Sequence, residues 1–172
     1  MHLSEIVQSI LDFVKVHEAW APVIAGTLAF GESFAIISLI IPATGALIGM
    51  GALIGASDVA FIPIWIAASV GAALGDWISY WIGWKLEDAA HHVWPLSRYP
   101  KMINRGEIFF KRYGIWSIFI GRFFGPVRAV IPLIAGTFEM PSPQFQLANW
   151  SSAFVWAFAL LAPGFAVLKF LS

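Results

Sequence analysis

The sequence predicts a small all-α integral membrane protein, and composition and pattern both support this class. Of its 172 residues, 59% are hydrophobic and only 12% are charged, whereas an ordinary soluble domain carries about 25% charged residues. Too few polar groups remain to cover a water-facing surface, and such high hydrophobicity also excludes a disordered chain. Long apolar stretches recur along the chain, and about 20 apolar residues are enough for a helix to cross the hydrocarbon layer.

Charge and cysteine content exclude several function classes. Ten basic residues balance ten acidic ones, so no overall field attracts nucleic acid. The chain has no cysteine, which excludes disulfides and thiolate metal sites. We expect a single membrane domain over residues 1–172 and no nucleic-acid partner. No metal or cofactor is expected, because no ligand set with zinc-like spacing is visible, and no enzymatic activity, because hydrolase motifs such as Gly-x-Ser-x-Gly do not occur.

Residues 3–18 predict an amphipathic helix that lies at the membrane interface. Apolar side chains recur there at helical spacing, with polar ones between them. The apolar side chains are Leu3, Ile6, Val7, Ile10, Leu11 and Val14.

The apolar region that follows, residues 20–57, is too long for one simple span and is interrupted. Glu32 lies in its first third and Pro42 near its middle. Because proline removes a helical hydrogen-bond donor, two short helical arms fit this region better than one rod. Broken backbone at membrane depth is tolerated only where protein or a water-filled cavity satisfies it.

A transmembrane helix is predicted over residues 59–84, and it carries Asp76. The next stretch, 85–112, is the most polar of the chain and holds six of the ten basic residues. Positively charged loops of membrane proteins lie mostly in the cytoplasm. We therefore expect the loop 85–112 to be cytoplasmic.

The second half of the chain repeats the plan of the first. A second broken apolar region, 113–138, contains the interrupting residues Pro126, Pro132 and Gly136, and residues 145–171 predict a last transmembrane helix. Corresponding interrupted segments in two halves are typical of inverted-repeat transporters, whose sites lie near the membrane midplane.

Four ionisable residues lie within these apolar stretches: Glu32, Asp76, Arg122 and Arg128. Each costs about 2.5–3.5 kcal/mol at a helix centre, so such residues usually have a function. Two acids and two bases could also form buried salt bridges whose only role is to stabilise the fold. Buried ion pairs are often no more stabilising than apolar packing, and we therefore favour function.

The residue types indicate a chemistry. Arg122 and Arg128 could converge on one anion, because the planar guanidinium matches phosphate oxygens and stays charged when it is desolvated. Desolvation of Glu32 and Asp76 favours their protonated forms, which makes both carboxyl groups candidates for proton exchange.

These residues belong to motifs that resemble those of the DedA family of bacterial inner-membrane proteins, over about residues 30–164. The most specific motif is Arg122-Phe123-Phe124-Gly125-Pro126-Val127-Arg128. Further motif residues are Glu32, Pro42-Ala43-Thr44, Gly71, Gly75-Asp76, Tyr80, Gly83, Gly136, Phe145, Asn149 and Trp156.

The resemblance implies two opposed re-entrant helical hairpins, arranged as an inverted repeat and braced by transmembrane helices. It also implies translocation of a lipid, with undecaprenyl phosphate as the leading substrate, and dependence on the proton gradient. By resemblance, Glu32 is the essential membrane acid and Arg122 and Arg128 are the essential arginines. Many members carry an acid where this chain has Thr44, whose hydroxyl remains able to donate to a lipid phosphate.

The sequence thus predicts a proton-coupled translocase for undecaprenyl phosphate or a phospholipid in the bacterial inner membrane. Its partners are the lipid and protons, and a homo-oligomer is compatible with the sequence. Arg122, Arg128 and Thr44 are expected to bind the phosphate, and Glu32 and Asp76 to carry protons. The expected hairpin-breaking residues are Pro42, Pro126, Pro132 and Gly136. The alternatives are a membrane enzyme acting on lipid phosphates, and a structural membrane protein whose buried charges only lock the fold.

The predicted orientation can be tested with a reporter fused after Arg98. We expect a cytoplasmic signal, because the basic residues of the loop 85–112 favour the cytoplasmic side. Paired phosphatase and fluorescent-protein fusions at this position would measure it, and a periplasmic signal would reverse the orientation.

Overall fold

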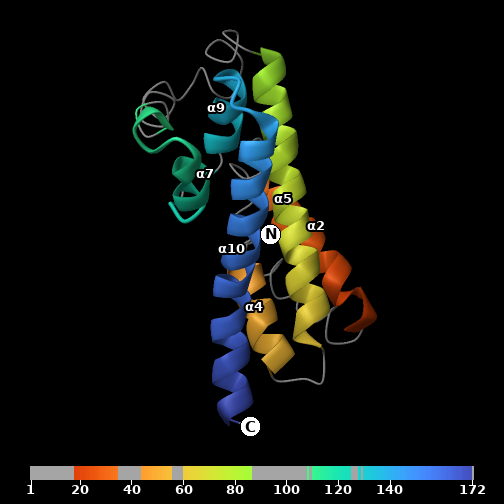
Figure 1. Ribbon diagram of the computed structural model, residues 1–172. Helices are drawn as coiled ribbons and strands as arrows, with labels where there is room; N and C mark the ends of the chain where they lie inside the picture. The colour runs from red at the N-terminus through yellow and green to blue at the C-terminus, as the bar shows by residue number, and fades with distance from the viewer. Residues whose placement is uncertain are drawn as a thin grey trace.

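The computed structural model describes residues 18–34, 44–55, 60–86, 108, 110–124, 128 and 130–171 (Figure 1). These parts of the chain form helices and contain no strand, as the predicted all-α class requires. The elements are η1 (Glu18–Trp20), α2 (Ala21–Ser33), α4 (Thr44–Gly55), α5 (Phe61–Leu86), α7 (Ile115–Gly121), α9 (Ile131–Thr137) and α10 (Ser142–Leu171). Nearly all of the expected interfacial helix 3–18 and most of the loop 85–112 lie outside the described residues, as do Pro42 and Pro126.

Two long helices, α5 and α10, form the axis of the molecule (Figure 1). Each contains a 26-residue apolar segment, Phe61–Leu86 and Ser142–Val167. At about 1.5 Å per residue such a segment is about 39 Å long, enough to cross a hydrocarbon layer of about 30 Å. These helices occupy the two stretches that the sequence predicts as transmembrane.

Contacts along their length show that α5 and α10 are antiparallel. The indole N–H of Trp65 donates to the carbonyl of Phe154 (2.9 Å), and Tyr80 near the other end of α5 stacks on Phe145 (4.2 Å between ring centroids). As the residue number rises along α5, the number of its partner on α10 falls. The two helices therefore run in opposite directions.

Within the described residues, the remaining helices are shorter than a membrane span. Helix α2 has 13 residues and α4 has 12, which corresponds to about 20 Å or less. In Figure 1, α2 and α4 lie beside one half of the α5–α10 pair, and α7 and α9 lie beside the other half. Each predicted broken region is thus represented by two short helices.

Close helix packing depends on glycines at three contacts. A Cβ atom added to Gly71 of α5 would lie 2.0 Å from the carbonyl oxygen of Gly26 on α2. Equivalent additions at Gly51, between α4 and α10, and at Gly83, between α5 and α9, would lie 2.3 Å and 2.0 Å from backbone oxygens. Small residues let membrane helices approach closely, which gives van der Waals contact in place of a hydrophobic driving force.

The buried apolar side chains form two clusters, one at each half of the axis. The first unites α2, α4, α5 and α10, and the second joins α5 and α10 to α7 and α9. Along α5, Asp76 lies between Ala73 of the first cluster and Tyr80 of the second. A buried polar layer therefore separates the two apolar clusters near the middle of the molecule.

The glycine contacts predict a clear stability difference between two alanine variants. Gly71→Ala should lower the free energy of unfolding by about 1–3 kcal/mol, because its methyl group would overlap the backbone of α2. Gly45→Ala is the matched control, since nothing lies within 4 Å of a Cβ at that exposed helical position. Tryptophan fluorescence during heating in one detergent measures both midpoints, and equal midpoints would contradict the proposed contact.

Candidate functional site

The four ionisable residues of the apolar stretches form two ion pairs. Arg122 pairs through Nη2 with Asp76 Oδ2, and Arg128 Nη1 lies 2.9 Å from Glu32 Oε1. In both pairs the acid comes from the first half of the chain and the arginine from the second. An unpaired charge is costly in a low-dielectric interior. Each ion pair therefore favours the folded state in which the two halves of the chain are in contact.

Arg122 follows directly on α7 and enters a frame built by α5 and α10. Its Nε donates to Ser152 Oγ (2.9 Å) and its Nη2 to Asn149 Oδ1 (2.7 Å). The amide of Asn149 in turn donates to the carbonyl of Ala73 on α5 (2.9 Å). Only 2% of the Arg122 side chain is exposed. This guanidinium is thus enclosed by two long helices and fixed on several sides.

Arg128 has a looser environment. Its Nη2 donates to Ser33 Oγ (3.0 Å), and its Cζ lies 4.4 Å from the centroid of the Trp156 ring. Its side chain is 12% exposed. The only charged partner of Arg128 within the described part of the chain is Glu32, so one anion neutralises this guanidinium.

Glu32 connects the two arms of the first broken region. It lies near the end of α2, and its Oε1 also accepts a hydrogen bond from the hydroxyl of Thr44, the first residue of α4. Its other oxygen, Oε2, is buried and has no partner among the described residues. Oε1 of Glu32 therefore accepts the hydrogen bonds of both Thr44 and Arg128, and Oε2 can accept a further one.

The structure refines the expected roles of the site residues. The sequence suggests that Arg122 and Arg128 converge on one anion, whereas each arginine has its own acid here. The expected phosphate donor, Thr44, donates to Glu32. Pro132 lies in the first turn of α9, and Gly136 lies within α9, where it contacts the Tyr80 backbone of α5.

Sequence reasoning named Asn149 and Trp156 only as motif residues and did not name Ser33 or Ser152, and it assigned a role to none of them. All four contact an arginine. Asn149, Ser152 and Trp156 recur at intervals of three and four residues on α10, so they share one helix face. Polar residues at such spacing inside an apolar span are the signal that could have revealed them.

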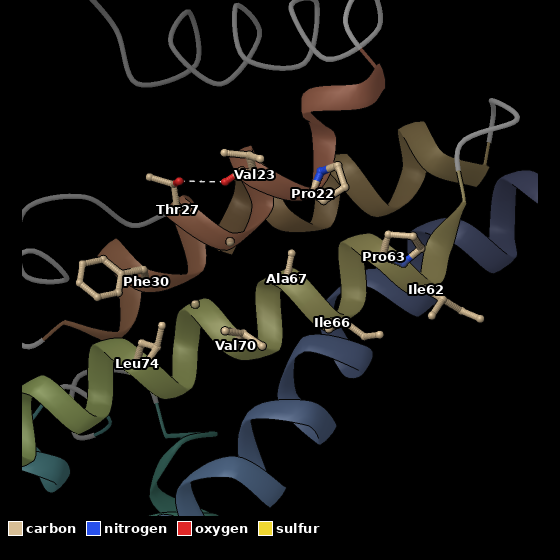
Figure 2. Close-up of a pocket in the computed structure, with 12 residues that line it drawn as sticks. Pro22, Val23, Thr27, Phe30, Ile62, Pro63, Ile66, Ala67, Val70 and Leu74 are labelled. Atoms are coloured by element: carbon tan, nitrogen blue, oxygen red, sulfur yellow. Dashed lines mark hydrogen bonds between the residues drawn. The ribbon is translucent and has the colours of Figure 1, made fainter.

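A separate groove lies between α2 and α5, and Figure 2 shows the side chains that line it. It is shallow, has a volume of about 700 Å³ and is lined mainly by apolar groups. The hydroxyl of Thr27 donates to the carbonyl of Val23 (2.8 Å), so this polar group is satisfied within α2. None of the four paired charges lines this groove.

The described residues contain no group of three histidine, aspartate or glutamate side chains able to hold a metal ion. The site consists of guanidinium, carboxyl, hydroxyl and amide groups. It can bind anions through guanidinium groups and bind protons through carboxylates.

Comparison with known proteins gives one family match. The model of the VTT domain matches residues 39–166. The inner membrane protein YabI of Escherichia coli is 34% identical over 137 residues, which are 80% of this chain and 54% of YabI. YghB, another inner membrane protein of E. coli, is 31% identical over 128 residues, 74% of this chain and 58% of YghB.

A third relative is the uncharacterized membrane protein BU139 of Buchnera aphidicola, 28% identical over 152 residues, which are 88% of this chain and 59% of that protein. This chain thus spans little more than half the length of these relatives. No solved structure matches the chain.

The two ion pairs predict different costs for neutralising their acids. Asp76→Asn should cost about 3–5 kcal/mol, because it leaves the enclosed Arg122 charge without a counter-ion. Glu32→Gln should cost clearly less, because Arg128 keeps Ser33, Trp156 and partial exposure. Thermal unfolding midpoints and yields in one detergent measure the difference. A larger loss of stability in Glu32→Gln than in Asp76→Asn would contradict the inference that Arg122 is the more tightly enclosed arginine.

Proposed function

We propose that this chain, which belongs to the VTT-domain (DedA) family of bacterial inner membrane proteins, translocates a phosphate-bearing lipid across that membrane. The family membership confirms the resemblance of the sequence motifs, and the names of the relatives agree with the predicted location. The observation that carries the proposal is the largely buried ion pair of Arg128 and Glu32, which joins the two halves of the chain.

Arg128 supports the proposal because its anion can be exchanged. A guanidinium binds carboxylate and phosphate oxygens with the same planar geometry. A lipid phosphate that approached Arg128 could thus replace Glu32 on Nη1, while the neutral partners Ser33 and Trp156 remained in place. Thr44, released from Glu32 in the same step, would then donate a hydrogen bond from its hydroxyl to the phosphate.

Proton coupling follows from the fate of the displaced carboxylate. Without Arg128, the Glu32 carboxylate would be a buried anion, which is strongly disfavoured. It would take up a proton and become neutral, so that one proton is bound when one phosphate replaces the carboxylate. When the lipid leaves, Glu32 would release this proton and pair again with Arg128.

Arg122 takes a different role in this proposal. Its Nε and Nη2 already bind Ser152, Asn149 and Asp76, and Nη1, which has no partner among the described residues, is buried with the rest of the side chain. A phosphate that replaced Asp76 would therefore have to enter an enclosed frame. We therefore assign the Arg122–Asp76 pair to the frame that fixes the second broken region against α5 and α10. This departs from the sequence expectation that Arg122 binds the phosphate and Asp76 carries protons.

The arrangement proposed for the membrane is that of two re-entrant segments. Helices α2 and α4 are too short to span the bilayer, and the acid near the end of α2 meets an arginine from the second half. Two broken segments that enter from opposite faces would bring these charges together near the midplane, as in inverted-repeat transporters. A lipid headgroup could reach that depth from either side. Undecaprenyl phosphate and phospholipids both present the phosphate that this site would bind.

A purely structural role is the second candidate. It is favoured by the pairwise neutralisation of all four charges, since two satisfied ion pairs could hold the fold without binding anything. In that case the loss of either pair would change stability and have no separate effect on lipid movement.

Transport in proteoliposomes tests the proposal. We expect Arg128→Ala and Glu32→Gln each to slow movement of a fluorescent polyprenyl phosphate by more than about tenfold, equivalent to at least about 1.4 kcal/mol. Arg128→Ala removes the phosphate ligand, and Glu32→Gln removes the proton carrier. A membrane-impermeant reductant measures the outward-facing label, with and without a pH gradient.

Arg112→Gln is the matched control, because Arg112 is an exposed basic residue that rests on the Tyr113 ring. Circular dichroism and melting curves establish that the variants are folded. Normal transport by both site variants would refute the assignment, and loss of folding in both would favour the structural role. Chromatography of the lipids after the assay would reveal any chemical conversion, which an enzyme would produce and a translocase would not.

A further inference from the structure

One face of α10 receives both arginines. Asn149 and Ser152 hold Arg122, and Trp156 lies against Arg128. The spacing of three and four residues places these side chains in one line along the helix. The last transmembrane helix thus supplies neutral partners to both guanidinium groups.

The contact between Trp156 and Arg128 is the closest cation–ring contact in the described part of the chain. Its distance is 4.4 Å, whereas the other such contacts measure 5.4–5.7 Å. Trp156 is 4% exposed and packs within the first apolar cluster, with Ala153 and Ala157 as cluster neighbours. Its ring is therefore held by packing, and the guanidinium rests against a fixed aromatic surface.

The attraction between Arg128 and Trp156 does not depend on the anion present. An arginine keeps its charge at any physiological pH, and a desolvated cation–π contact is equivalent to about a thirtyfold change in an equilibrium constant. When Glu32 is protonated or displaced, Arg128 loses its charged partner and retains only neutral ones. Of these, Trp156 offers a negatively polarised surface and Ser33 a single hydroxyl.

We propose that Trp156 is a positioning residue, which holds the Arg128 guanidinium in place while its anionic partner is exchanged. The transport part of this inference rests on the proposed function. The stability part concerns only the ion pair of Arg128 and Glu32.

A series of fluorinated tryptophans at position 156 tests the transport part. Each fluorine withdraws electron density from the ring face and changes the ring shape little, so packing is conserved while the cation–π attraction weakens. We expect the transport rate to fall progressively with the number of fluorines, by about tenfold over the series. The same series at Trp150 is the control, because that residue of α10 also packs against the first apolar cluster and no cation lies over its ring in the described structure.

A double-mutant cycle tests the stability part without any transport measurement. Trp156→Leu is made in the natural chain and in Glu32→Gln, which imitates the neutral carboxyl group. We expect Trp156→Leu to lower the unfolding midpoint about twice as much in the Glu32→Gln chain, because Arg128 then depends on the ring. Additive effects would indicate that Trp156 only fills space.

The outcomes separate the two proposals. A flat fluorine series in a chain that transports the lipid would overturn the role of Trp156 and leave the proposed function standing. If the natural chain moves no lipid phosphate, the proposed function fails, and the double-mutant cycle alone tests the role of Trp156. Non-additive midpoints would then support the positioning of Arg128 by Trp156, and additive midpoints would overturn it.

Discussion

The structure depends on one electrostatic constraint, which is that four charges must be neutralised inside an apolar protein. A single buried charge costs several kcal/mol unless a partner of opposite sign lies within contact distance. Because both acids lie in the first half of the chain and both arginines in the second, neutralisation requires the halves to close on each other. The glycines at the helix contacts make that closure sterically feasible, since any side chain at Gly71 or Gly83 would separate the backbones.

The two ion pairs are chemically alike but have different surroundings, and this difference suggests that they have different roles. Arg122 is held by several partners from two long helices, so its frame resists change. Arg128 has one charged partner, one hydroxyl and one aromatic ring. Exchange of an anion requires that the arginine stay in place while its partner leaves. The Arg128 side chain is 12% exposed and that of Arg122 only 2%, so an incoming anion reaches Arg128 more readily.

Much of the fold could be predicted from the sequence, because hydrophobic length and interruption are local properties. The spans around α5 and α10 follow from two 26-residue segments of high mean hydropathy, and the charges of the site are conspicuous within apolar segments. The pairing of the charges could not be predicted, because it depends on which helices meet. The spacing of six residues from Arg122 to Arg128 suggests that both reach one anion, yet different helices, α5 and α2, supply their acids. Asn149, Ser152 and Trp156 were missed as site residues because amides, hydroxyls and indoles are also common in helix packing and at membrane interfaces.

The central claim is that a lipid phosphate replaces Glu32 on Arg128 while Arg122 stays paired with Asp76. Solid-state NMR can measure it directly, through the dipolar coupling between the phosphorus of a bound polyprenyl phosphate and the labelled guanidinium carbons of the protein. Arg122→Lys and Arg128→Lys chains would assign the signals of the two site arginines. We predict close contact of the phosphorus with Arg128, together with an unchanged Arg122 signal. Contact of the phosphorus with Arg122, or with neither arginine, would contradict the claim.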